Sequence, residues 1–160
     1  MERKSLLDAI RVVKENERLA AEFYGKAAET TGNRMGREVF TQLREFEQFH
    51  YARLTVLEKS LEQKGEFIFY EGKDFPLPPR IAPEPTEEPH QQTVIKIIVE
   101  AMELEKKAEQ AYADLAEQIT DQEGHAMFRR LSEEEHKHYR FLREAYWNLS
   151  NFKAWKWALP

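Results

Sequence analysis

The strongest constraint on the fold is an internal repeat. The two halves of the chain align without a gap at a constant offset of 88 residues, the separation of Glu47 from Glu135. The alignment matches histidines, tyrosines, glycines and phenylalanines, which helical sequences rarely pair by chance. The matched pairs are Glu17 and Glu105, Ala20 and Ala108, Tyr24 and Tyr112, Gly36 and Gly124, Phe40 and Phe128, Leu43 and Leu131, Glu47 and Glu135, His50 and His138, Tyr51 and Tyr139, and Leu54 and Leu142. We infer a duplicated helical hairpin.

Each copy of the repeat contains two segments in which apolar residues recur at steps of three and four, the spacing of an amphipathic helix. We expect helices over about 5–30, 33–64, 89–119 and 121–147. Ser5 and Asn33 are the expected N-caps of the first two, since short polar side chains accept hydrogen bonds from the first turn. Only a few residues join the helices within each copy, so each pair should form an antiparallel hairpin.

A proline-rich segment at about 65–88 separates the two hairpins, and proline disfavours helix because it fixes φ and lacks an N–H. An extended connection of this length can return along a whole helix. It therefore predicts an all-α four-helix bundle with one long crossover between the second and third helices. A linker between two separate hairpins is the alternative, although a lone hairpin buries little apolar surface. We assign the bundle to residues 1–147 and an aromatic C-terminal tail to residues 148–160.

Composition narrows the classes of function. The formal net charge of -5 argues against nucleic acid or an anionic membrane as a partner. The chain has no cysteine, which excludes disulfides, thiol catalysis and thiolate-bound metal sites. No apolar run is long enough for a membrane span or a signal peptide. We therefore expect a cytoplasmic protein.

The inward faces of the predicted helices carry acids and imidazoles among their apolar residues, an unusual composition for a core. The first and third helices contribute one glutamate each. The second and fourth contribute a Glu-x-x-His pair each, and this i, i+3 spacing places both side chains on one helix face. The six candidate metal ligands are Glu17, Glu47, His50, Glu105, Glu135 and His138.

Four carboxylates in a core cannot all stay ionised without compensation. The inward faces supply no matching lysine or arginine, whereas two divalent cations would balance the four negative charges. Oxygen and nitrogen ligands without sulfur suit iron or manganese, with zinc as an alternative. One glutamate from each of two helices and Glu-x-x-His from each of the other two is the pattern of carboxylate-bridged dinuclear bundles.

The fourth helix also contains a second Glu-x-x-His pair, Glu133 with His136. The repeat favours the pair Glu135 and His138, and helical phase places Glu133 and His136 on a charged, solvated face. Three histidines are therefore expected at the surface: His90, His125 and His136.

Tyr24 and Tyr112 each lie two turns from a candidate ligand on the same helix face. Core packing is one interpretation. In the other, each phenol hydroxyl bonds to a ligand carboxylate, where it could orient that ligand or supply a proton.

Four stretches of the chain resemble the helices of the ferritin-like superfamily, most closely of its rubrerythrin-like branch: ENERLAAEFYGKAAE, LREFEQFHYARL, ELEKKAEQAYADLAE and LSEEEHKHYRFL. The resemblance covers roughly residues 5–147 and implies a site of two iron ions that reacts with hydrogen peroxide or dioxygen. It implies that Glu47 and Glu135 bridge the metals and that His50 and His138 hold one metal each. The single-helix ligands would be Glu17 and Glu105.

The chain departs from rubrerythrins in two respects. They usually append a four-cysteine rubredoxin domain that delivers electrons, so turnover here requires an external electron-transfer protein. They also carry an additional glutamate on the third helix, at the position of Ala108. We expect a rubrerythrin-like peroxidase or oxidase. The alternatives are a ferroxidase or iron-handling protein, a dimanganese catalase-like enzyme and an interaction bundle without redox chemistry.

Aromatic residues outside the predicted helices suggest further packing. Trp147, Trp155 and Trp157 near the C-terminus are too apolar to leave in water. We expect them, and the FIFY segment at 67–70, to pack on the bundle or on a second subunit, and we expect a homodimer.

Overall fold

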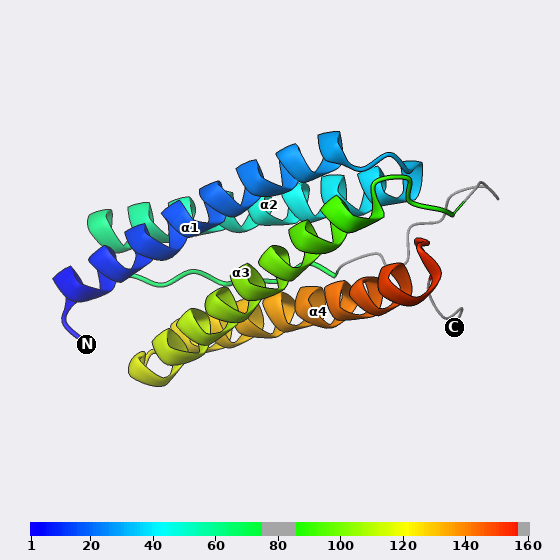
Figure 1. The fold of residues 1–160 in the computed structure, drawn as a ribbon. Coiled ribbons are helices and arrows are strands. Elements are labelled where there is room, and N and C mark those ends of the chain that lie inside the picture. Colours follow the sequence, from blue (N-terminus) through cyan, green and yellow to red (C-terminus); the bar gives the residue numbers. More distant parts are fainter. Residues whose placement is uncertain (75–85, 157–160) are drawn as a thin grey trace.

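The computed structural model describes residues 1–74 and 86–156, and this part of the chain forms four helices (Figure 1). Helices α1 (Arg3–Thr30) and α2 (Arg34–Gln63) form one antiparallel hairpin, and α3 (Gln91–Gln118) and α4 (Gln122–Phe152) form the other. The hairpins pack together, and all four helices contribute to a shared apolar core. The predicted all-α bundle is confirmed. No helix in residues 1–74 or 86–156 combines the length and apolarity needed to cross a membrane.

The helix ends follow the predicted caps in part. Asn33 accepts a hydrogen bond from the backbone N of Met35 at 2.8 Å, as expected for the α2 N-cap. The predicted Ser5 cap is wrong, because α1 begins two residues earlier and Glu2 occupies the N-cap position. Helix α4 extends past the expected end near Trp147, because the chain leaves helical geometry only at Lys153, whose φ is 56°.

The crossover leaves α2 at Gly65 and runs along the bundle toward the end where α1 meets α2 (Figure 1). Tyr70 is buried, Phe67 and Ile68 pack partly against the core, and Phe69 is exposed. The FIFY segment therefore packs on the bundle, and no strand forms in the described part of the crossover. The prolines at 76, 78, 79, 83 and 85 lie outside the described residues.

Two repeat-related glycines make room for two aromatic rings, Trp155 and Phe67, which are themselves 88 residues apart. A Cβ on Gly36 would lie 2.6 Å from the Trp155 ring, and a Cβ on Gly124 would lie 2.6 Å from the Phe67 ring. A glycine near the start of α2 therefore lets the C-terminal tail pack closely on one half of the bundle. The equivalent glycine near the start of α4 lets the crossover pack closely on the other half.

A buried carboxylate ties the tail to the end of the crossover. Glu88 accepts hydrogen bonds from the Trp155 indole and the Gly32 backbone N, both at 3.0 Å, and from the Thr31 hydroxyl. Trp155 is fully buried, so this part of the tail packs on the bundle as expected. Trp147 is 57% exposed, and Trp157 lies outside the described residues.

Candidate metal centre

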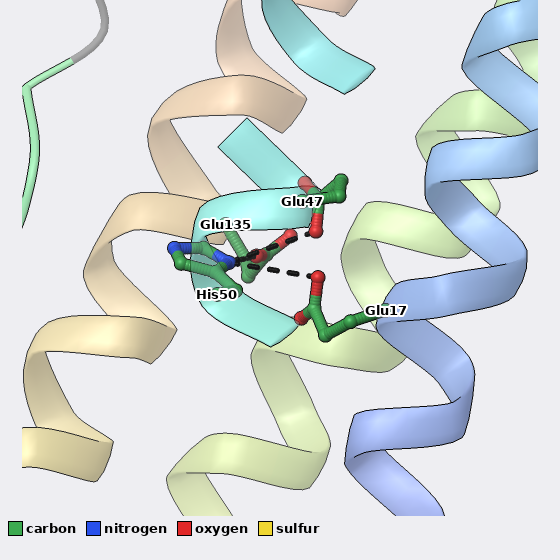
Figure 2. Close-up of side chains that lie close together, drawn as sticks. All are labelled: Glu17, Glu47, His50 and Glu135. Carbon is green, nitrogen blue, oxygen red and sulfur yellow. Dashed lines mark ion pairs between the residues drawn. The ribbon is translucent and has the colours of Figure 1, made fainter. Parts of the chain in front are cut away.

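The six side chains singled out from the sequence converge in the middle of the bundle, where all are at most 2% exposed. They form two overlapping groups in which the potential ligand atoms lie within 4.8 Å of one another. One group is Glu17, Glu47, His50 and Glu135, drawn in Figure 2. The other is Glu47, Glu105, Glu135 and His138. Glu47 and Glu135 belong to both groups, which is the placement expected of two bridging carboxylates.

Both imidazoles direct Nδ1 toward the carboxylates. His50 Nδ1 lies 3.6 Å from Glu17 Oε2, 3.6 Å from Glu47 Oε2 and 2.8 Å from Glu135 Oε1 (Figure 2). His138 Nδ1 lies 3.4 Å from Glu47 Oε1 and 3.6 Å from Glu105 Oε2. The repeat thus places one imidazole beside each single-helix glutamate.

The crowding of acids shifts the ionisation of the cluster. Burial and the neighbouring carboxylates raise the pKa of Glu17 and Glu135 well above its ordinary value. Burial opposes a charged imidazole, but the carboxylates around His138, Glu105 foremost, raise its pKa to about 9. Burial also opposes charge on Glu47, yet interactions with its neighbours Glu17, His138 and His50 hold its pKa below the usual range. Without a cation, the cluster therefore retains protons at neutral pH.

The atoms available to a cation are buried and lack hydrogen bonds within the described residues. The carboxylate oxygens in this state are Glu17 Oε2, Glu47 Oε1, Glu105 Oε2 and Glu135 Oε1. His50 Nδ1 is in the same state, because its short contact with Glu135 lacks hydrogen-bond geometry. Buried polar atoms without partners are rare and costly in folded proteins. Oxygen and imidazole lone pairs pointing at a common centre fit two divalent ions of the iron or manganese type.

The two buried tyrosines connect the halves of the repeat. Tyr24 donates to Glu105 Oε1 at 2.6 Å, and Tyr112 donates to Glu17 Oε1. Each tyrosine on α1 or α3 therefore orients the single-helix glutamate of the opposite hairpin. This geometry favours the hydrogen-bonding interpretation of Tyr24 and Tyr112 over core packing alone.

Sequence reasoning missed a fifth buried glutamate at the cluster, Glu134, which is 1% exposed. Its Oε1 lies 2.8 Å from His50 Nε2 and accepts a hydrogen bond from Tyr70 at 2.6 Å. Its Oε2 accepts from Arg130 Nε at 2.9 Å and from the backbone N of Lys73 at 2.8 Å. Burial opposes its charge, but bonding to His50 and these donors lowers its pKa to about 2. Helical periodicity could have identified Glu134, because it lies seven residues after the core residue Met127 and therefore on the same face of the helix.

The remaining histidines lie away from the cluster. His90 is exposed, and His125 and His136 are half-buried. His136 Nδ1 lies 3.1 Å from Glu109, and Glu133 is exposed, so this pair is a peripheral one as predicted.

Comparison with known proteins agrees with this architecture. Residues 77–146 match the rubrerythrin family model. A solved structure of a hypothetical protein from Pyrococcus furiosus superimposes with a TM-score of 0.74 and 27% sequence identity, covering 94% of this chain and 93% of that one. None of the curated proteins compared with the chain matches it significantly. The family match and the four-helix fold support a ferritin-like di-iron family, and the buried cluster supports a metal site within it.

Proposed function

We propose that this bundle, ferritin-like in fold and matched to rubrerythrin over residues 77–146, is a non-haem di-iron oxidoreductase that reacts with hydrogen peroxide or dioxygen. One observation carries the proposal: two groups of buried ligand atoms share Glu47 and Glu135. A shared pair of carboxylates suits two adjacent cations far better than two independent sites.

Each residue of the cluster has a defined role under this proposal. Glu17 and His50 would hold one ion, and Glu105 and His138 the other. Glu47 and Glu135 would contact both. Four carboxylates and two neutral imidazoles would balance two divalent charges, which removes the electrostatic cost of burying the acids.

Two bound ferrous ions would polarise the O–O bond of the oxidant and supply one electron each. The chain itself provides the surroundings for that reaction. Burial excludes bulk water from the cluster, and Tyr24 and Tyr112 hold Glu105 and Glu17 in place. Burial and nearby carboxylates raise the pKa of both phenols well above 10, so each hydroxyl keeps its proton and donates a hydrogen bond to its glutamate.

The net reaction converts one hydrogen peroxide, two electrons and two protons into two water molecules. An external electron-transfer protein would supply the electrons, since the chain has no cysteine for a rubredoxin-type centre. We also expect a homodimer, which sizing chromatography would detect at twice the 19.0 kDa chain mass, whereas an iron-storage cage would elute far larger.

The test is anaerobic loading with ferrous iron, followed by metal analysis and addition of peroxide. We expect about two iron ions per chain, rapid consumption of peroxide and near-ultraviolet absorption of ferric iron. A Glu47→Gln, Glu135→Gln double variant should lose the iron and the reaction together. Wild-type protein that binds two iron ions but consumes no peroxide or dioxygen would contradict the redox proposal.

A dimanganese catalase-like reaction is the second candidate. The ligand set suits manganese as well as iron, and disproportionation of peroxide needs no external reductant, in keeping with the absence of cysteine. Manganese-loaded protein that evolves dioxygen from peroxide without a reductant, while iron-loaded protein does not, would favour this candidate.

A further inference from the structure

A cavity of about 390 Å³ lies between α1 and α3. The opposite side of the cluster is closed by the crossover, because Tyr70 bonds to Glu134 on α4 and its ring lies against Phe49 on α2. The cluster can therefore be approached from the α1–α3 side.

Small residues create this cavity. Ala20 and Ala108, which the repeat relates to each other, both line it, together with Ala111. Larger apolar side chains, among them Val13, Phe23 and Leu104, form the rest of its wall. An alanine at two equivalent positions on facing helices leaves a gap that a longer side chain would fill.

The floor of the cavity is the cluster itself. Glu17, Glu47, Glu105 and Glu135 all line the cavity. Oε2 of Glu17 and Oε2 of Glu105 are buried and accept no hydrogen bond within the described residues. Asn16, Glu100 and Lys107 also line it, and all three are exposed. The cavity thus has apolar walls, a polar mouth and a floor of candidate ligands.

Its volume exceeds what the proposed oxidants require. A water molecule takes about 30 Å³ in the liquid, and peroxide or dioxygen is of similar size. The cavity is roughly ten times larger and falls within the range of about 300–1,000 Å³ typical of sites for organic ligands. A water-filled cavity with largely apolar walls is also unfavourable.

We propose that this cavity binds a neutral, apolar organic molecule with one polar end, such as an aliphatic alcohol, beside the metal centre. The apolar body occupies the space beside Ala20 and Ala108, and the polar end meets water near Asn16 and Lys107. A neutral ligand fits better than an anion, because most of the wall is apolar. The inference deepens the proposed function by naming a class of organic molecule at the same centre, but binding rests on the walls and does not require the metal.

The test uses n-butanol, n-hexanol and n-octanol as probes, titrated by calorimetry into the metal-free and the iron-loaded full chain. Each pair of added methylene groups should tighten binding by about tenfold, since each buried methylene contributes roughly 0.8 kcal/mol. Ala108→Phe should weaken octanol binding at least tenfold by filling the cavity. Ala52→Phe, at an exposed position of α2 outside the cavity, is the matched control and should leave binding unchanged.

Helix content by circular dichroism and iron stoichiometry establish that Ala108→Phe folds; if it does not, Ala20→Leu replaces it with the same expected loss. The inference is overturned if the affinity does not depend on the length of the alcohol, or if it is equal in the wild type and the cavity-filling variants. A change of oligomeric mass in Ala108→Phe also overturns it, since this would identify a second copy of the chain as the occupant. Octanol binding without iron binding refutes only the proposed function, and iron-dependent peroxide consumption without octanol binding refutes only this inference.

Discussion

Glu134 lies 2.8 Å from Nε2 of His50, whereas the equivalent residue in the other half of the repeat is Phe46, whose ring packs edge-on against His138 at 4.4 Å between centroids. The Phe46 ring also lies edge-on to His50, at 5.3 Å between centroids, so the contact with Glu134 is what distinguishes the surroundings of His50. A carboxylate behind a ligand histidine fixes its tautomer and raises its basicity. The repeat is symmetric in its candidate ligands but not in the residues that support them, so we expect two unequal metal positions.

Glu134→Gln should weaken the metal position that contains His50 and leave the other nearly unchanged. The carboxylate that orients His50 is lost, and loss of such a partner typically costs about 10–100-fold in metal affinity. Competitive titration with cobalt(II) should show that one cobalt ion binds more weakly than in the wild type and that the other binds with unchanged affinity. Glu133→Gln, at the exposed neighbouring position, serves as control. An equal change at both positions would contradict the predicted inequality.

Substitution of a single-helix glutamate should remove fewer metal ions than substitution of a glutamate that both groups share. Glu17 belongs to one group of candidate ligands, whereas Glu47 belongs to both. We expect Glu17→Gln to retain about one metal ion per chain and Glu47→Gln to weaken both, as measured by metal analysis after gel filtration. Glu105→Gln is the matched counterpart of Glu17→Gln. Retention of two tight ions by Glu47→Gln would show that this carboxylate does not bridge.

The contrast between Glu47 and Glu134 shows what the sequence could predict. The repeat identified Glu47, because its partner Glu135 lies on the same helical stripe of the other half. Glu134 was missed because the same reasoning discards residues without an acidic counterpart, and its counterpart is Phe46. Its partners Tyr70 and Lys73 lie on the crossover, whose path depends on packing rather than on helical periodicity. The burial of Trp155 against Gly36 likewise depends on where the tail folds back.

The metal-free protein should lose stability as pH rises from about 6.5 to about 9, because folding raises the pKa of His138 from 6.5 to about 9. A group with a raised pKa stabilises the fold fully below its unfolded pKa, and this stabilisation is lost as pH rises through the folded value. Glu17 and Glu135, whose pKa is also raised, act in the same direction.

Bound metal should reverse this trend, because cations displace the retained protons and bind more tightly at higher pH. Thermal unfolding of the metal-free and iron-loaded forms across this range measures both effects. Calorimetry in buffers of different ionisation enthalpy should detect protons released on loading. A metal-free melting temperature that rises with pH would refute the protonated state inferred for the cluster.

Glu88→Ala should destabilise the fold without affecting the metal centre. Glu88 accepts hydrogen bonds from the Thr31 hydroxyl, the Trp155 indole and the backbone N–H groups of Gly32 and His90, so its removal deprives two buried and two partly buried donors of this acceptor. Each unsatisfied buried group costs about 1–3 kcal/mol, and we expect a loss of about 2–4 kcal/mol in the free energy of unfolding, measured with urea.

At acid pH, the difference in the free energy of unfolding between Glu88→Ala and the wild type should become smaller. Burial opposes charge on Glu88, but the hydrogen bonds from Thr31 and its other donors lower its pKa. Such a carboxylate stabilises the fold above its unfolded pKa of about 4.3, and this stabilisation is lost as pH falls through the lowered folded value. Glu87→Ala, at the adjacent exposed position, should have little effect at any pH. Loss of iron from Glu88→Ala at neutral pH would show instead that the hydrogen bonds of Glu88 and the metal centre are coupled.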